Sequence, residues 1–96
     1  MILSVLAALS EPTRFEAVRR LGNGLEHCVC ELMDALGATQ SRMSRHMHIL
    51  KQAGLVVDWR DAQWVRYRLN PDLAPELVKV IDAVLAAEID SERKAA

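Results

Sequence analysis

The sequence has few of the residues that define many other classes of small protein. Only four of its 96 residues are aromatic, although 51% are hydrophobic, mainly Leu, Ala and Val. That balance is typical of helices with aliphatic faces rather than of a β-sandwich. A chain of this length makes one domain, residues 1–96, with a limited core, so we expect dimerisation to add buried area.

Missing features also exclude whole functional classes. No run approaches the roughly 18 apolar residues that a membrane span requires. The apolar start of the chain, residues 1–9, has neither the basic region nor the cleavage site of a signal peptide. There is no Gly-rich phosphate loop, nucleophile–base pair or pair of carboxylates in an apolar setting, which argues against an enzyme. We expect a cytoplasmic protein with no membrane partner, and two cysteines that are reduced thiols.

Apolar side chains at helical spacing predict five helices. The predicted helices span residues 1–9, 11–21, 27–36, 39 or 40 to 53, and 72–90. Ser10 is the expected N-cap of the second helix, because serine is a preferred capping residue. Pro12 then lies in the first turn, where its missing N–H group costs nothing. The charged tail, residues 91–96, is expected to fray.

Two short segments between the fourth and fifth helices have strand character. Residues 55–60 are rich in β-branched and aromatic residues, and residues 63–69 alternate with period two, so we predict a hairpin closed at residues 61–62. Trp59 and Trp64 are expected to be cross-strand partners. The third and fourth helices are joined by a tight glycine-containing turn, a helix-turn-helix over residues 28–53. A hairpin over 55–69 directly after it is a wing. The predicted fold is therefore mainly α with a β-hairpin wing, a dimeric winged helix-turn-helix.

The charge distribution favours binding to DNA although the net charge, −1, does not. Residues 42–68 hold six basic and two acidic side chains, a net of +4 between acidic flanks. Arg and Gln at the start of a recognition helix can read guanine and adenine, and arginines on a wing suit the DNA backbone or minor groove. A solvated basic helix face is the alternative. The candidate DNA contacts are Gln40, Ser41, Arg42, Ser44, Arg45, His46, Arg60 and Arg66.

The most specific motif is Cys28-Val29-Cys30. Isolated cysteines are usually small buried hydrophobes, and a disulfide across two positions of a helix would be strained. Two adjacent soft thiolates, however, chelate thiophilic ions. Helical residues two apart point about 200° away from each other, so a chelate requires an irregular or unwound first turn. Because this helix supports the recognition helix, a ligand that prefers the distorted state would weaken DNA binding.

The ordered motifs resemble the ArsR/SmtB family of metalloregulatory repressors, and within it the arsenic-responsive branch. The matching segments are Leu9-Ser10-Glu11-Pro12-Thr13-Arg14, Cys28-Val29-Cys30-Glu31-Leu32, Ser44-Arg45-His46-Met47-His48-Ile49-Leu50, Gly54-Leu55-Val56 and Trp64-Val65-Arg66-Tyr67-Arg68-Leu69. The resemblance implies a homodimer paired through its first and last helices, residues 1–9 and 72–90. It also implies double-stranded operator DNA as partner, and a trivalent arsenical or antimonite as the inducer held at Cys28 and Cys30.

The sequence departs from the family pattern at the inducer site. The arsenic site of the family has a third cysteine where this chain has Met33, so arsenite would need another ligand: solvent, a small thiol or His27. Methylarsenite needs only two thiolates, and we expect the site to accept it as well as arsenite. The last helix carries Asp82, Glu88 and Asp90 but no histidine, which argues against the family's zinc site there.

Two alternatives stay open. Cys28 and Cys30 could act as a thiol redox switch of a transcriptional regulator. The chain could also be a dimerisation module that binds no DNA and uses only its apolar helices.

Overall fold

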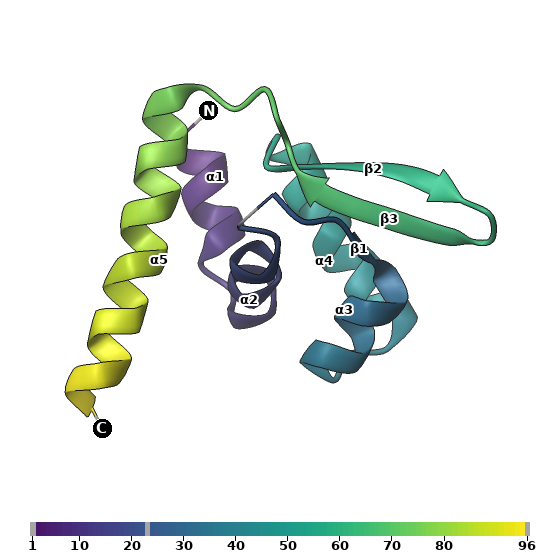
Figure 1. Cartoon of the computed structure of the whole chain (residues 1–96), viewed down its shortest axis with the longest axis horizontal. Helices are drawn as coiled ribbons and strands as arrows, with labels where there is room; N and C mark the ends of the chain where they lie inside the picture. Colours follow the sequence, from purple (N-terminus) through teal and green to yellow (C-terminus); the bar gives the residue numbers. More distant parts are fainter. Residues whose placement is uncertain (1, 23, 96) are drawn as a thin grey trace.

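The computed structural model describes the backbone of residues 2–22 and 24–95, and the side chains of those residues as far as Glu88. Five helices and three strands follow one another in the order α1, α2, β1, α3, α4, β2, β3, α5. The hairpin of β2 and β3 projects from one end of the molecule, and α5 lies at the other, beside α1 (Figure 1). The predicted winged helix-turn-helix is confirmed.

The N-terminal pair of helices, α1 (Ile2–Leu9) and α2 (Pro12–Leu21), is joined by a tight turn. The N-cap of α2 is Glu11, whose carboxylate accepts a hydrogen bond from the Arg14 N–H at 2.9 Å. The prediction of Ser10 as the cap is wrong. The Ser10 hydroxyl instead donates to the Ala7 carbonyl at 2.7 Å and so satisfies the end of α1.

The predicted helix over residues 27–36 is wrong at its start. His27 and Cys28 form a short strand, β1, and α3 runs from Val29 to Leu36. The backbone of Cys28 is extended, and the residue is the N-cap of α3. Glu31 completes a capping box by accepting the Cys28 N–H.

The recognition helix of the predicted helix-turn-helix is α4 (Gln40–Gln52), capped by Thr39. The turn between α3 and α4 depends on Gly37, which has φ 65° and ends α3 in the left-handed region that favours glycine. The short turn joins α3 to α4, and the two helices pack against each other.

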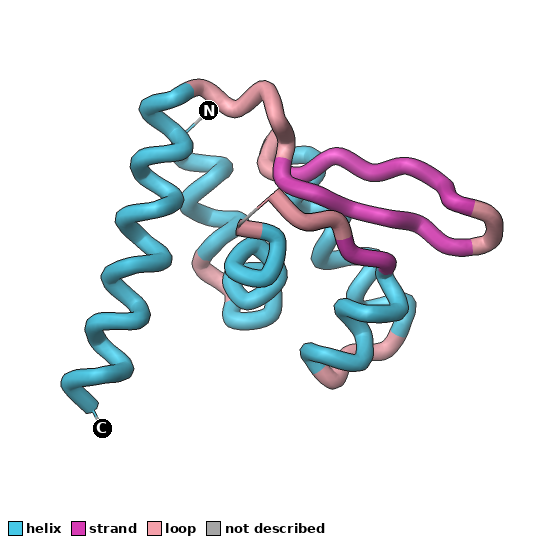
Figure 2. The backbone as a smooth tube through the Cα atoms, in the orientation of Figure 1, coloured by secondary structure: helices cyan, strands magenta, loops and turns pink. Residues whose placement is uncertain are grey.

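The sheet is three-stranded and antiparallel, with the order β1-β3-β2. The wing consists of β2 (Val56–Asp61) and β3 (Trp64–Leu69), and its turn lies one residue later than predicted, at residues 62–63. Trp59 pairs with Arg66 and Trp64 pairs with Asp61. The two tryptophans, which were expected to be cross-strand partners, are therefore diagonal neighbours across the hairpin rather than directly opposite each other. Figure 2 shows β1 as a short strand beside the long hairpin.

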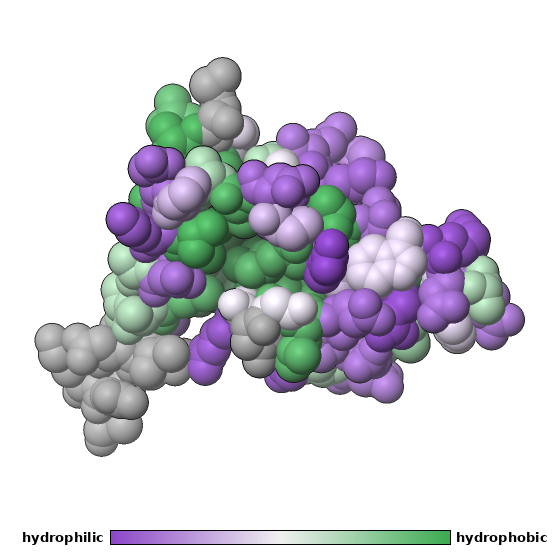
Figure 3. Space-filling model, turned by 45° about the horizontal axis from the view of Figure 1, so that its top comes forward, coloured by the Kyte–Doolittle hydropathy of each residue, from purple (hydrophilic) through white to green (hydrophobic). Residues whose placement is uncertain are grey.

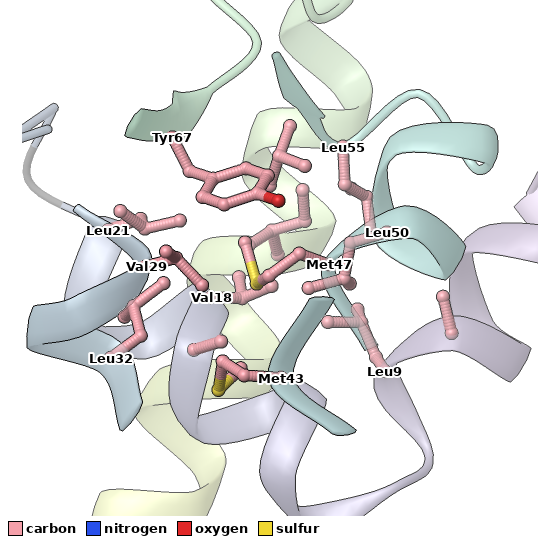
Figure 4. Close-up of a cluster of buried hydrophobic side chains, with 14 of the residues drawn as sticks. Leu9, Val18, Leu21, Val29, Leu32, Met43, Met47, Leu50, Leu55 and Tyr67 are labelled. Atoms are coloured by element: carbon pink, nitrogen blue, oxygen red, sulfur yellow. The ribbon is translucent and has the colours of Figure 1, made fainter. Parts of the chain in front are cut away.

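The core lies where α2, α3, α4 and the base of the wing meet (Figure 4). Val18 and Leu21 of α2 pack with Leu32 of α3, and Tyr67 closes the core from β3. The inward face of α4 consists of Met43, Met47 and Leu50, all completely buried. Burial of each large aliphatic side chain contributes about 1.5–3 kcal/mol, and this core fixes the orientation of the recognition helix.

The last helix, α5 (Pro75–Ala95), differs from its prediction at both ends. It begins three residues after residue 72, because residues 70–73 form a turn in which the Asp72 N–H donates to the Asn70 side chain. It also continues through the tail that was expected to fray. Among the side chains of α5 that the structure describes, residues 75–88, Ile81 is the one that is buried, and most of the others are exposed. In the part of the chain that the structure describes, no helix is long and apolar enough to cross a membrane.

Candidate functional site

The solvent face of α4 carries most of the predicted DNA contacts. Gln40, Ser41, Arg42 and Arg45 are exposed, and Ser44 is partly buried. The first turn is fixed by Thr39, whose hydroxyl accepts the Arg42 N–H at 3.3 Å. A polar, basic stripe thus begins at the N-terminus of α4, opposite the buried face.

His46 is held differently from its neighbours on α4. Its side chain is 15% exposed, and its Nδ1 lies 3.2 Å from Arg14 Nη1 and 3.6 Å from Glu11 Oε2. Arg14 in turn donates from Nε to the Ala8 carbonyl at 2.7 Å. These contacts attach the recognition helix to the junction of α1 and α2, which favours a positioning role for His46.

Glu11 is stabilised as a carboxylate in this cluster. Burial raises the pKa of Glu11. The hydrogen bonds from the backbone N–H groups of Arg14 and Thr13, together with the proximity of His46, lower that pKa by more, so the net pKa lies below its usual value. The α1–α2 junction therefore presents a stable anionic acceptor to His46 and Arg14.

The wing arginines have unequal surroundings. Arg60 and Arg68 are exposed, whereas the side chain of Arg66 is 24% exposed and donates from Nε to Glu26 Oε1 at 2.9 Å. Arg68 lies on the same face of β3 as Arg66 by the period-two alternation, and its exposure makes it a further wing arginine available to DNA. Lys51 forms a further ion pair, with Asp58 at 2.9 Å, and so joins the end of α4 to β2.

The two cysteines lie where β1 ends and α3 begins, and they are joined by a disulfide. The prediction of two separate thiols is wrong in this structure. The reason is the extended backbone of Cys28, which precedes the helix and brings the two Cα atoms to 5.2 Å. The irregular first turn that a chelate requires is therefore already present. Cys28 is buried (3% exposed) and Cys30 is partly exposed.

The residues around the cysteines are held by Glu31. Its Oε1 accepts the Cys28 N–H at 2.9 Å, and its Oε2 lies 3.3 Å from His27 Nδ1. The Cys28 hydrogen bond is the main reason that the pKa of Glu31 lies below its usual value. Sequence reasoning missed Glu31, although a glutamate three residues after an N-cap is the signal of a capping box.

Neither Met33, which replaces the third cysteine, nor His27, the predicted third ligand from the protein, stands free. Met33 packs against the hydrophobic core, and His27 Nδ1 is engaged by Glu31. Among the side chains that the structure describes, no three from His, Cys, Asp and Glu are grouped to hold a metal ion.

This arrangement of helices and wing defines the chain as a winged helix-turn-helix protein. The fold is shared with the homodimeric winged helix-turn-helix DNA-binding domain of a possible ArsR-family regulator from Mycobacterium bovis. That solution structure has a TM-score of 0.75 and 21% identity, and the alignment covers 99% of this chain and 83% of the other. Residues 11–57 match the family described as "Bacterial regulatory protein, arsR family".

Two relatives make the family assignment firm. The chain is 41% identical over 83 residues to the arsenic resistance transcriptional regulator ArsR2 of Pseudomonas putida, covering 86% of this chain and 72% of the relative. It is 35% identical over 86 residues to the arsenical resistance operon repressor of Escherichia coli, covering 90% of this chain and 74% of that one. The chain belongs to the ArsR family of bacterial regulatory proteins. The family resemblance and the prediction of a regulator rather than an enzyme are confirmed.

Proposed function

We propose that this protein is a homodimeric repressor that binds double-stranded operator DNA and is released by a trivalent arsenical held at Cys28 and Cys30. One observation carries the proposal: the two sulfurs meet at the N-cap of α3, the helix packed directly against the recognition helix. The names of the relatives, which refer to arsenic resistance, support the class of inducer.

DNA contact is assigned to the N-terminal half of α4 and to the wing. Arg42 and Arg45 are exposed and suited to guanine or phosphate, and Gln40 is suited to adenine. Ser41 and Ser44 supply hydroxyls to the DNA backbone, and Arg60 contacts the duplex from the wing. His46 serves chiefly to position α4 through Arg14 and Glu11.

Dimerisation is assigned to α1 and α5. Ile2, Leu3 and Leu6 of α1 and Val78 of α5 are large hydrophobic residues exposed to solvent. Figure 3 shows hydrophobic surface gathered on the side of α1 and α5, whereas the wing side is mostly hydrophilic. A groove adjoins this surface and is lined by Ile2 of α1, by Ala74 just before α5, and by Glu76, Leu77 and Val80 of α5. Covering it with a second copy removes apolar area from water, and two copies present two recognition helices to a palindromic operator.

The inducer site requires the reduced form of the cysteine pair, because a disulfide offers no thiolate. Once reduced, Cys28 and Cys30 present two soft sulfurs from positions two residues apart. This pair suits a methylated arsenical, which needs two thiolates. Arsenite or antimonite would take its third ligand from solvent or a small thiol, since His27 is engaged by Glu31. A regulator of this kind acts in the cytoplasm, where thiols are kept reduced.

Binding at the cysteines weakens DNA binding through the first turn of α3. The Cys30 N–H donates to Cys28 Sγ at 3.1 Å, so the sulfur is part of the helix cap. A ligand on that sulfur competes for the acceptor and alters the cap. Because α3 packs on α4 across the Gly37 turn, a change in the first turn of α3 also shifts the proposed DNA-contacting residues of α4.

The test compares the reduced wild type with a Cys28→Ser/Cys30→Ser variant on DNA from upstream of the protein's own gene. We expect equal DNA affinity without inducer, because neither cysteine is among the proposed DNA contacts. Methylarsenite should release the wild type and leave the variant bound. Fluorescence anisotropy measures both.

Three outcomes would contradict the proposal. Release of the serine variant would place the inducer elsewhere, failure of the wild type to respond to any trivalent arsenical or to antimonite would remove this class of inducer, and lack of binding to DNA would remove the repressor function.

The disulfide favours a second candidate, a regulator that responds to oxidation. The two thiols can lose two protons and two electrons to an oxidant and form the bond seen here. Release by diamide and no release by arsenicals would favour this candidate over the first.

A further inference from the structure

The cysteine segment is attached directly to the wing as well as to α3. Strand β1 pairs with β3, the central strand of the sheet, so that Cys28 lies opposite Arg66 and His27 lies opposite Tyr67 (Figure 1). The inducer residue thus shares a backbone ladder with a strand of the wing. The sequence gives no sign of this pairing, because residues 27–36 have helical periodicity.

Side chains reinforce the ladder on both sides of Cys28. Glu26, two residues before it, accepts a hydrogen bond and ion pair from Arg66 Nε at 2.9 Å. Glu31, three residues after it, accepts the Cys28 N–H at 2.9 Å, and the charge of Arg66 helps to lower the pKa of Glu31. Arg66 is therefore paired with the carboxylate that precedes the cysteine segment, and Cys28 itself is hydrogen-bonded to the carboxylate that follows it.

From this placement we propose that Glu26 and Arg66 form a link that carries a change at Cys28 and Cys30 to the wing. Arg66 is then a positioning residue of the wing rather than a DNA contact. The inference deepens the proposed function and rests on it where the signal is an arsenical. It adds a second route of release, from β1 to β3, to the route from α3 to α4.

The physical reason is the double role of Cys28. Its backbone belongs to the β1–β3 ladder, and its sulfur belongs to the cap of α3. A change in the state of the sulfur moves the cap relative to the ladder. The Glu26–Arg66 ion pair opposes slippage of β1 along β3. A displacement of β1 therefore moves β3 of the wing as well, rather than changing only the conformation of the loop before β1.

The link is tested by hydrogen–deuterium exchange of the wing amides, residues 56–69, in two states of the cysteines. The first state is the dithiol. The second is a bridged pair, made in one arm with diamide, which takes two electrons and two protons from the thiols. In the other arm it is made with phenylarsine oxide, which joins both sulfurs to arsenic with loss of one water. Mass spectrometry confirms each bridge.

The decisive variant is Glu26→Gln, and its matched control is Glu16→Gln, which removes a carboxylate from α2. We expect bridging to change wing exchange in the wild type and in Glu16→Gln. In Glu26→Gln the change should be about two- to fivefold smaller, the size that coupling through an exposed ion pair allows. Arg66→Gln should reduce it equally, and the double variant should reduce it no further, as expected of two residues in one interaction.

The outcomes separate this link from the proposed function. An equal change in wild type and Glu26→Gln, or no change in the wing of the bridged wild type, would overturn the link. If phenylarsine oxide does not bridge the cysteines, but diamide changes the wing in the wild type and less so in Glu26→Gln, the link stands and the arsenical function fails.

Discussion

The wing end and the α1–α5 end of the molecule expose different side chains to solvent. At the wing end, Gln40, Arg42, Arg45, Arg60 and Arg68 are exposed over a core that is fully closed. At the other end, Ile2, Leu3, Leu6 and Val78 are exposed. The first surface suits a polyanion, whereas the second has too many adjacent apolar side chains for a face meant to stay in water. One small fold therefore carries two partner surfaces that can be tested separately.

The largest effect is expected at the basic end. Arg42→Ala/Arg45→Ala should weaken operator binding by about 100-fold or more, because each good arginine contact to a base is worth about 1–3 kcal/mol. Lys79→Ala, which removes a positive charge from α5, is the matched control and should bind nearly as the wild type. Anisotropy at fixed salt measures both. Unchanged affinity of the double variant would favour the dimerisation module that binds no DNA.

Breaking the apolar end should produce monomers. Leu3→Lys/Leu6→Lys should raise the dimer dissociation constant by more than about tenfold, since each leucine loses about 1.5–3 kcal/mol of apolar burial. The control is Leu25→Lys in the loop before β1, because Leu25 is also exposed (54%, against 75% for Leu3) but belongs to neither helix. Sedimentation velocity distinguishes the species. If Leu25→Lys is monomeric and Leu3→Lys/Leu6→Lys remains dimeric, the dimer interface lies near the loop before β1 and not on α1.

A smaller effect is expected between the two ends, at His46. His46→Ala should lower the free energy of unfolding by about 1 kcal/mol, the usual value of a hydrogen bond that connects elements. It should also lower DNA affinity modestly, because α4 is less well positioned. His48→Ala, an exposed neighbour on the same helix, should change stability by less than about 0.5 kcal/mol. If His46→Ala loses affinity with no change in stability, His46 contacts DNA directly.

The smallest effect is the acid sensitivity of Glu11 and Glu31. Both carboxyls have pKa values lowered in the folded state by the hydrogen bonds of their caps. The stability that they contribute is present above the ordinary glutamate pKa of about 4.3 and is lost as the pH falls through the lower folded value. In Glu31→Gln, the free energy of unfolding should fall less than in the wild type as the pH is lowered through this range. Urea titrations at a series of pH values measure the difference. A variant with the full acid sensitivity of the wild type would contradict the role of Glu31.

The periodicity of apolar residues was sufficient to predict those helices that bury one face against the rest of the protein. Apolar side chains at helical spacing predicted α4, whose buried side is Met43, Met47 and Leu50, and glycine predicted the tight turn before it. The apolar character of α1 predicted a surface in need of a partner. These features are local, so residue types and their spacing determine them.

The errors that change the candidate site fall where distant segments meet. Strand β1 has only two residues and no period of its own, and it exists because β3 pairs with it. That pairing extends the backbone at Cys28, separates it from α3 and brings the two sulfurs together. The contact of His46 with Glu11 and Arg14, and that of Arg66 with Glu26, also depend on tertiary placement. In both cases, a charged or polar side chain assigned to DNA is engaged within the protein.

The most direct test of the proposed function is one anisotropy titration with reduced wild-type protein and labelled DNA from upstream of its own gene, repeated with arsenite and with methylarsenite. We predict tight binding that methylarsenite reverses at equimolar amounts and that arsenite also reverses. Tight binding that neither arsenical changes would contradict thiol sensing of arsenic and leave oxidation as the signal. Absence of binding under reducing conditions would contradict the repressor itself.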